Sequence, residues 1–316
     1  MVESILTTEL IMNERIIVSV DGGLGDHVSA EPAVRYLIEK VYPQGDIHIS
    51  CALPRVFAHL GVPTHLHNTF DGEERLSYRK IFTFPTEGPI QQAVCFLVMH
   101  IVDFHAAALM YRSLPLLDKT VRLEVTAGDR AELARVLGGV DPRTLTLVHA
   151  GKSWQTKTFP LAWWQETVDL LAARGQKVAL VGKRGSEVGN QTGLVEVNAP
   201  SGALDLRDKL SLGSLFALLE AAPVLLSNDS SLVQIAGAFD NWIVMIATCK
   251  HPDFVFPYRV GSPYYKARAL YKRLLIDDLP FEPLRDGALH VEVPVPDWTP
   301  YLPDPITVAL EIEKIR

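Results

Sequence analysis

The sequence predicts an α/β fold in which two doubly wound parallel sheets face each other across a cleft. Three observations predict it. Short apolar, β-branched runs alternate with segments of helical periodicity through most of the chain. Polar or glycine-rich turns follow the strands, and a glycine-rich break near residue 140 separates two such series. The 316 residues are also enough for two domains of ordinary size. We therefore expect one domain over residues 1–140, a second over 141–290, and a segment over 291–316 that could cross back to the first.

The composition is typical of a soluble globular protein, with 48% hydrophobic and 21% charged residues. A net charge of −7 and a pI near 5.8 argue against a surface built to bind nucleic acid or anionic lipid. The chain has three widely spaced cysteines without a CxxC pair, which are Cys51, Cys95 and Cys249. They predict free thiols in a reducing compartment. Because neither a signal peptide nor an apolar run long enough to span a membrane is apparent, we expect a cytoplasmic protein.

The first expected strand, residues 15–20, is a compact β-branched run that leads into a glycine-rich turn. Apolar residues then recur at helical spacing up to Val41, so the first unit is strand, turn and helix. The turn does not fit the dinucleotide-binding fingerprint, because Val28 stands where the third glycine belongs. Asp26 lies where the strand's carboxyl end meets the helix, so it either caps the helix or faces a ligand.

The middle of the first half gives weaker signals. A second strand is expected over residues 46–51 and a short helix over 54–60, followed by a turn-rich stretch from 61 to 92. Three histidines fall here, namely His59, His65 and His67. They lack cysteine or carboxylate partners at ligand spacing, so we predict a surface loop and no metal site. Residues 94–112 predict a mostly buried helix, whose polar residues are either satisfied in the core or part of an acceptor site.

The second half shows a more regular alternation. It follows an amphipathic helix over residues 129–137 and the clearest linker signal of the chain, residues 138–143. The expected strands are residues 145–149, 177–181, 223–227 and 242–247, and the expected helices are 160–173, 212–221 and 232–239, with a final helix after the last prolines. Strands that alternate with helices in this way form a parallel sheet, whose ligands bind at the carboxyl ends of the strands.

The turns that follow three of these strands offer positive charge and hydroxyl groups. Their polar residues are Lys152, Lys157, Lys183, Arg184, Asp229, Ser230 and Ser231. A lysine together with a helix N-terminus matches the charge of a diphosphate. Each turn alone is also explained by a solvated loop, or by helix capping through Asp229. Together they favour a phosphate-containing ligand, and the lack of a GxxxxGK[ST] pattern excludes a P-loop nucleotidase.

Three segments, residues 25–35, 149–164 and 228–238, together resemble a known family. The first is similar to a "GD…P-A-L-R" turn and helix, the second to a "G…K-x-W-P…W" segment, and the third to a "D-[ST]-G-x-x-H-x-A-A" donor loop. These are motifs of the ADP-heptose heptosyltransferases of lipopolysaccharide synthesis. That family, glycosyltransferase family 9, consists of inverting enzymes with the GT-B fold of two Rossmann-like domains. The resemblance runs through most of the chain and implies a donor in the C-terminal half and an acceptor in the N-terminal half.

The resemblance also implies roles for individual residues. Asp26 would be the general base that deprotonates the acceptor hydroxyl. The acceptor side would include Gly23, Gly25 and His27, and the donor side Ser153, Thr156, Lys157, Gly182, Lys183, Asp229, Ser230, Ser231 and Gln234. Lys157, with Thr156 or Ser153, would hold the donor's phosphates. No metal and no cofactor is implied, because lysines and a helix dipole stabilise the departing diphosphate.

The chain departs from the family's pattern at three positions. Ser231 replaces the usual glycine, Gln234 the usual histidine and Phe159 the usual tryptophan. Gln234 forms hydrogen bonds but carries no charge, which leaves open a different donor sugar or a weaker phosphate contact. Residues 249–268 are rich in aromatic and basic side chains, which is consistent with a packed loop or with a base-stacking or acceptor-binding surface.

We therefore predict a metal-independent, inverting glycosyltransferase that moves a heptose or related sugar from an ADP- or UDP-linked donor to an acceptor hydroxyl. The expected acceptor is a glycan or lipid-linked saccharide, and a modified DNA base or a protein is the alternative. Two rivals remain. A nucleotide-sugar epimerase would release a free epimer, and a catalytically silent sugar-nucleotide-binding protein would bind its ligand without turnover.

Overall fold

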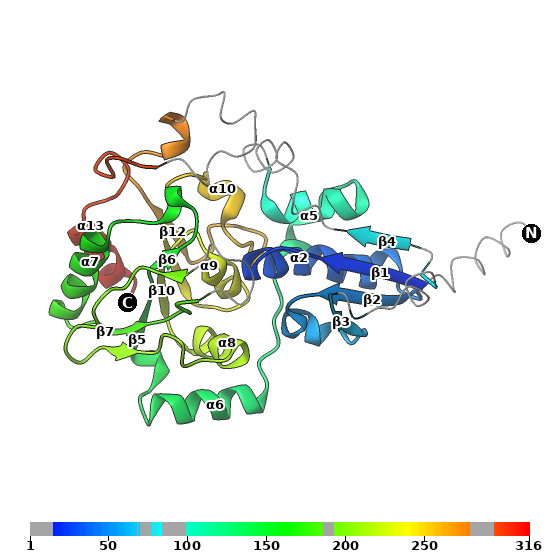
Figure 1. The fold of residues 1–316 in the computed structure, drawn as a ribbon, viewed down its shortest axis with the longest axis horizontal. Coiled ribbons are helices and arrows are strands. Elements are labelled where there is room, and N and C mark those ends of the chain that lie inside the picture. The colour runs from blue at the N-terminus through cyan, green and yellow to red at the C-terminus, as the bar shows by residue number, and fades with distance from the viewer. Residues whose placement is uncertain are drawn as a thin grey trace, which may run out of the picture.

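The computed structural model describes residues 15–67, 69, 77–78, 80–83, 99–185, 193–278 and 294–316 (Figure 1). Four expectations fall wholly or partly outside them. One is the turn-rich stretch at residues 61–92, of which only residues 61–67, 69, 77–78 and 80–83 are described. The other three are the start of the helix predicted from residue 94, the end of the loop after the strand at 177–181, and the thiol of Cys95. The other two cysteines, Cys51 and Cys249, are buried free thiols.

The N-terminal half is built on a parallel sheet with the strand order β3-β2-β1-β4. Its strands are β1 (Arg15–Val20), β2 (Asp46–Cys51), β3 (Thr64–Leu66) and β4 (Lys80–Thr83). Its helices are α2 (Leu24–Tyr36), which continues into a π-helical turn over Leu37–Val41, the 3₁₀-helix Pro54–Leu60, and α5 (Ile101–Met110). β1 lies in the middle of the sheet, where it pairs with β2 and β4, and most of its side chains are buried. Helix α2 packs against α5.

The second half contains a larger parallel sheet with the order β12-β11-β10-β5-β7-β9. Its strands are β5 (Leu145–His149), β7 (Lys177–Leu180), β9 (Leu204–Asp205), β10 (Val224–Asn228), β11 (Trp242–Ile246) and β12 (Ala267–Leu270), and a short antiparallel pair joins β6 (Gly151–Lys152) to β8 (Gly193–Leu194). Its helices are α6 (Ala127–Leu137), α7 (Leu161–Ala173), α8 (Leu212–Ala221), α9 (Ser231–Ala236), α10 (Pro252–Val255) and α13 (Pro305–Ile315). Short 3₁₀ turns occupy Leu116–Lys119, Pro142–Thr144, Gln155–Lys157 and Leu275–Asp278.

The predicted α/β class with two parallel sheets is confirmed, and the longer strands lie where the sequence placed them. The sequence did not predict the short pair β6 and β8, nor the short strands at the edges of the two larger sheets, which are β3, β4, β9 and β12. Such strands contain too few residues for an alternating or continuously apolar pattern to stand out.

Two segments lie elsewhere than expected. Helix α6 was assigned to the first domain by the boundary at residue 140, but it packs against α8 in the second half. Residues 294–316 do not cross back to the first sheet as expected, because α13 packs along α7 at the far side of the second half (Figure 1). Val308 and Ile312 are buried there with Trp164 and Leu171. The sequence shows that α13 has an apolar face, but it does not show which helix packs against that face.

The two halves are joined by a continuous apolar core. One cluster of buried side chains runs from the first sheet through α2 and α5 to α8, α9 and the second sheet. Polar contacts reinforce the joint, since His100 Nε2 lies 2.7 Å from the carbonyl oxygen of Phe256. At the same joint α2 packs against α9, and a Cβ added to Gly25 would lie 3.5 Å from the Cα of Ser231. In the described part of the chain no helix is long and apolar enough to cross a bilayer.

Candidate functional site

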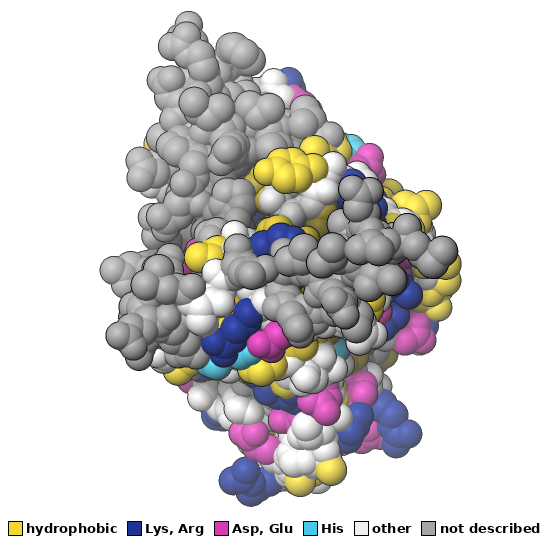
Figure 2. Space-filling model, turned by 90° about the vertical axis from the view of Figure 1, so that its right-hand side faces the viewer, with side chains coloured by type: hydrophobic (Ala, Val, Ile, Leu, Met, Phe, Trp, Pro, Cys, Tyr) yellow, Lys and Arg dark blue, Asp and Glu magenta, His cyan; other side chains and the backbone are white. Residues whose placement is uncertain are grey.

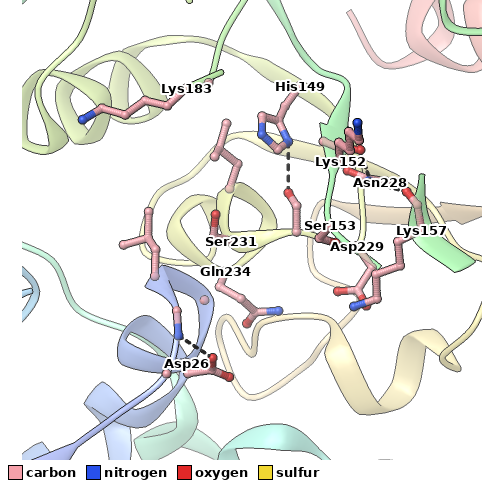
Figure 3. Close-up of a pocket in the computed structure, with 18 of the residues that line it drawn as sticks. Asp26, His149, Lys152, Ser153, Lys157, Lys183, Asn228, Asp229, Ser231 and Gln234 are labelled. Atoms are coloured by element: carbon pink, nitrogen blue, oxygen red, sulfur yellow. Dashed lines mark hydrogen bonds and ion pairs between the residues drawn. The ribbon is translucent and has the colours of Figure 1, made fainter. Parts of the chain in front are cut away.

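A cavity of about 480 Å³ lies where the two halves meet. The carboxyl end of β1 and the start of α2 form one wall, and the turns after β5, β7, β10 and β11 form the other. This is where an open parallel sheet binds ligands, because the helix N-termini there point their free N–H groups outward. Figure 3 shows side chains of both walls around this space, with Asp26 on one side and Lys157 and Asp229 on the other.

Asp26 is fixed at the N-terminal turn of α2. Its Oδ2 accepts a hydrogen bond of 2.8 Å from the backbone N–H of Gly23, and the carboxylate lines the cavity. Gly22 is required beside it, because its φ of +95° is strained for other residues and a Cβ there would lie 2.6 Å from the same Oδ2. Asp26 therefore both caps the helix and faces the cavity, so the two interpretations of its sequence position are compatible.

Across the cavity, Lys157 and Asp229 form a buried ion pair of 2.5 Å between Nζ and Oδ2 (Figure 3). Asn228 holds the two loops together, since its Nδ2 donates to the carbonyl oxygens of Gly151 and Lys157 at 2.9 and 2.7 Å. Burial acts to lower the pKa of Lys157, but Asp229 and other nearby anions outweigh it, so the pKa is raised. Lys157 therefore stays charged in a site from which water is largely excluded.

His149, at the end of β5, contacts the turn after β10 on the second-half wall of the cavity. Its Nδ1 lies 3.1 Å from the hydroxyl of Ser227 and 3.2 Å from that of Ser230 (Figure 3). Burial lowers the pKa of His149 to about 4, so the ring is neutral near pH 7. A neutral imidazole can position the Ser230 hydroxyl without adding charge. Sequence reasoning did not assign this residue, although a histidine that ends an apolar strand is a signal of its position.

A second group that the sequence analysis did not assign surrounds Trp154. The ammonium group of Lys157 lies 4.0 Å from the centroid of this ring, and that of Lys250 lies 4.6 Å from it. All three side chains line the cavity. Lys250 follows β11, so the rule that ligand-binding residues follow parallel strands applies to it as it does to Asp229.

The structure brings most of the sequence-predicted site residues to one cavity. Those that line it are Gly23, Gly25, Asp26, Ser153, Lys157, Gly182, Lys183, Asp229, Ser230, Ser231 and Gln234. Lys183 lies at the other end of the cavity from Lys157 (Figure 3). Gln234 is buried, and its Nε2 donates to the carbonyl of Val255 at 2.6 Å, while its Oε1 has no hydrogen-bond partner among the described residues.

Three predicted residues do not line the cavity. The guanidinium group of Arg184 instead forms ion pairs with Glu196 and Asp208 at 3.0 and 2.6 Å.

Thr156 and His27 are the other two. Thr156 is fully buried behind the cavity, and its carbonyl accepts a hydrogen bond of 2.8 Å from the hydroxyl of Thr248. His27 points into the core, where its Nδ1 lies 2.9 Å from the carbonyl of Gly23 and its ring packs near Phe57. Neither side chain is placed to touch a ligand. The sequence places both residues in the correct segments, but it does not show which side chains of those segments point into the core.

Comparison with known proteins identifies the family. A sequence profile of glycosyltransferase family 9 (heptosyltransferase) matches residues 70–263, which is more than half of the chain. The chain belongs to glycosyltransferase family 9. It is thus an enzyme of a sugar-transferring family, as the three motifs predicted. A search of curated protein sequences finds no match.

Solved structures show the same fold at low sequence identity. A family 9 glycosyltransferase from Veillonella parvula is 14% identical, with a TM-score of 0.65 over 96% of this chain and 97% of that one. ADP-heptose LPS heptosyltransferase II from E. coli is 18% identical, with a TM-score of 0.64 over 95% and 98%. The E. coli heptosyltransferase WaaC, solved with ADP, is 12% identical, with a TM-score of 0.50 over 96% and 100%. The predicted GT-B fold is therefore confirmed.

The loop at residues 249–268 of this family 9 enzyme is mostly a packed structural segment. Arg259 is buried, and its guanidinium donates to the carbonyls of Phe239, Asn241, Tyr265 and Lys266. Its charge is thus used to close the loop onto the second sheet, and it is not available to stack on a base. On the face shown in Figure 2, the visible basic side chains are interspersed with acidic ones and do not form a stripe. Of the two interpretations of this loop, packing is the one that the geometry supports, except at Lys250.

The histidines of the first half are not in a surface loop, which corrects that expectation. His65 belongs to β3 and stacks on His48 of β2 at a ring-centroid distance of 5.2 Å. His59 lies 3.0 Å from the buried carboxylate of Glu31, and His67 lies 2.9 Å from the carboxylate of Asp21. Among the described residues, no group of three or more His, Cys, Asp or Glu side chains is arranged to hold a metal ion.

Proposed function

We propose that this family 9 enzyme transfers a heptose or related sugar from an ADP-linked donor to an acceptor hydroxyl, with inversion at the anomeric carbon. The observation that carries the proposal is the opposition of Asp26 to Lys157 and Asp229 across one cavity (Figure 3). A carboxylate on one wall and a buried cation on the other suit a reaction in which a proton leaves the acceptor while negative charge develops on the diphosphate. The family profile and the WaaC structure solved with ADP favour an ADP-heptose donor.

The steps follow from the positions of the groups. The acceptor hydroxyl enters beside Gly23 and Gly25, and Asp26 takes its proton as the oxygen attacks the anomeric carbon. The bond between that carbon and the diphosphate oxygen breaks, and its electron pair leaves with ADP. Lys157 and the Ser230 and Ser231 hydroxyls stabilise the departing charge, so the step as proposed uses no metal. Attack from the Asp26 wall, opposite the diphosphate, inverts the anomeric configuration.

Gln234 is the candidate contact to the donor sugar. The residue lines the cavity, and its buried Oε1 has no hydrogen-bond partner among the residues that the structure describes. A buried acceptor without a partner costs about 1–3 kcal/mol, which a sugar hydroxyl would recover. The Nε2 bond to Val255 fixes the amide so that the carbonyl oxygen, and not the nitrogen, is offered to the donor.

The acceptor that we propose is a glycan or lipid-linked saccharide. The packed role of Arg259 gives a nucleic-acid acceptor no support, and a protein acceptor is left to the experiment.

The proposal is tested by donor binding and by ADP release. Thermal shifts are measured with ADP-, UDP-, GDP- and CMP-sugars, with and without EDTA, on the wild type, Asp229→Ala and Asp26→Asn. We expect stabilisation of roughly 2.7 kcal/mol at ~100 Kd of an ADP-sugar, unaffected by EDTA, lost in Asp229→Ala and kept in Asp26→Asn. With a saccharide acceptor, ADP release is expected to fall at least 100-fold in Asp26→Asn. Asp21→Asn, the same change outside the cavity, is the control.

Other outcomes would select the rivals. Release of a free epimer without acceptor would identify an epimerase. Binding with no ADP release from any acceptor would identify a silent binding protein. No shift with any nucleotide sugar would overturn the proposal.

A further inference from the structure

Lys250 has a position that the motifs do not explain. It lies in the turn after β11, its side chain lines the cavity, and only 8% of the residue's surface is exposed. A lysine is rarely buried to this extent without a specific partner. Its ammonium group lies over the ring of Trp154, which is shared with Lys157.

Lys250 lies near a second positive charge, that of Lys157. The groups that act on it are Lys157, Asp229, the buried thiol of Cys249 and, across the cavity, Asp26. Burial and then Lys157 lower the pKa of Lys250 to about 8, while the carboxylates of Asp229 and Asp26 oppose that change. Burial raises the pKa of the Cys249 thiol, so the thiol stays protonated near pH 7. Two ammonium groups thus lie over one ring at the edge of the cavity, and an anion that entered the cavity would be attracted to both.

We propose that Lys250 is a second cation for the donor's diphosphate, held with Lys157 on the ring of Trp154. The inference rests on the proposed function and adds a ligand to it. A diphosphate has two phosphoryl groups, and two lysines contributed by different loops can each form a charge-assisted hydrogen bond to one of them. Trp154 keeps both ammonium groups oriented toward the cavity before the donor arrives. Lys250 also supplies a positive charge on the donor side, where the uncharged Gln234 supplies none.

The test measures the binding of ADP and of AMP by calorimetry to the wild type, Lys250→Met and Lys250→Arg. Loss of a charge-assisted hydrogen bond is expected to weaken ADP binding roughly 10- to 100-fold in Lys250→Met, and AMP binding less. Lys250→Arg should restore most of the preference for ADP. Lys177→Met is the matched control, because this exposed lysine starts β7 at the opposite end of the strand from the cavity. Thermal denaturation without ligand shows whether each variant is folded.

A second readout separates a ligand from a merely structural lysine. A bound diphosphate raises the pKa of Lys250, so ADP binding at pH 8 should take up about half a proton, because a group with a pKa of about 8 is half protonated there. Calorimetry in buffers of different ionisation enthalpy measures this uptake. It should be absent in Lys250→Met and present in Lys177→Met.

The outcomes distinguish this inference from the proposed function. Unchanged ADP affinity and proton uptake in folded Lys250→Met would overturn the inference and leave the proposed function standing. Lys250-dependent binding of inorganic pyrophosphate, with no preference for ADP over other nucleoside diphosphates, would support the inference and count against an ADP donor. Wild-type protein that binds neither ADP nor pyrophosphate would overturn both.

Discussion

At the scale of single residues, close packing around His149 fixes the donor side of the site. Gly182 has a φ of +122°, and a Cβ there would lie 2.8 Å from both His149 Cδ2 and Leu194 Cδ2. On the other side of the ring, a Cβ on Gly151 would lie 2.7 Å from His149 Cε1. The imidazole ring therefore packs tightly against the backbone at Gly151 and at Gly182, and this packing keeps Nδ1 beside the Ser230 hydroxyl.

We expect Gly182→Ala to lower the free energy of unfolding by about 1–3 kcal/mol, because it adds backbone strain and overpacks the His149 ring. ADP affinity should fall with it, since a shifted His149 no longer orients Ser230. The measurements are urea unfolding and calorimetric ADP binding. Gly202→Ala is the control, because Gly202 has a φ of +79° but no atom within 4 Å of an added Cβ. Equal losses of stability and ADP affinity in the two variants would contradict this packing role of Gly182.

At the same scale, the sequence predicted the polar groups that line the cavity better than the groups that support them. Asp26, Lys157 and Asp229 follow strands, so the rule for parallel sheets located them. His149 and Trp154 act through a neighbour's hydroxyl or ammonium group. The Ser230 hydroxyl and the Lys250 ammonium group belong to loops that are distant in the chain, so the sequence does not show these contacts. Lys250 follows a strand, as Asp229 does. It was missed because residues 249–268 were interpreted together as one loop, and no separate role was assigned to this lysine.

At the scale of elements, a buried ion pair ties α2 to its surroundings. Glu31 is fully buried and accepts from Arg35 Nε at 2.8 Å and from the backbone N–H of Arg122 at 2.9 Å. Arg35 in turn donates to the carbonyls of Asp118 and Thr120 at 3.1 and 2.8 Å. The helix that carries Asp26 is thereby fixed to the segment that leads into the second half.

Glu31→Gln should therefore destabilise the fold by about 3–5 kcal/mol, because it leaves the Arg35 charge buried without its carboxylate. Urea unfolding monitored by circular dichroism measures the change. In contrast, Asp141→Asn, which removes the carboxylate of the exposed Asp141–Arg143 pair, should have little effect. A Glu31→Gln variant as stable as the wild type would show that the network does not hold α2.

The sequence predicted which segments form helices and strands better than it predicted which of them pack together. β5, β10 and β11 are buried on both faces, so they read as continuous apolar runs with helices between them. The amphipathic pattern of α6 and α13 was equally visible. Which surface each helix covers depends on the fold of the rest of the chain, and for this reason α6 and α13 were both assigned to the wrong neighbours.

At the scale of the whole molecule, three buried histidines lie at the contacts that hold its parts together. His100 contacts the carbonyl of Phe256 between the halves, His105 Nε2 lies 2.9 Å from the Ser29 hydroxyl between α5 and α2, and His149 joins β5 to Ser227 of β10. Burial lowers the pKa of His100 and His149 to about 4 and that of His105 to about 3. All three are neutral in the folded protein near pH 7.

The enzyme should therefore lose stability in mild acid. A histidine whose pKa is 6.5 when unfolded and about 4 when folded binds more protons in the unfolded state between these values. Stability consequently does not depend on these groups above pH ~6.5 and falls as the pH drops toward ~4. With three such groups, the slope approaches about 4 kcal/mol per pH unit. Because one apolar core spans both halves, we expect this loss to appear as a single unfolding transition.

Urea unfolding at several pH values between 7.5 and 4.5 measures the slope. Replacing one buried histidine by a residue that does not titrate, as in His105→Asn, should reduce the slope by up to about 1.4 kcal/mol per pH unit, even if it lowers stability at every pH, since the slope counts only protons. The exposed His251→Asn is the matched control. Stability that stays constant from pH 7 to pH 4.5 would mean that these histidines are hydrated or already charged in the folded enzyme. In that case the contact between the halves at His100 and Phe256 would not be the closed, water-free joint that its geometry indicates.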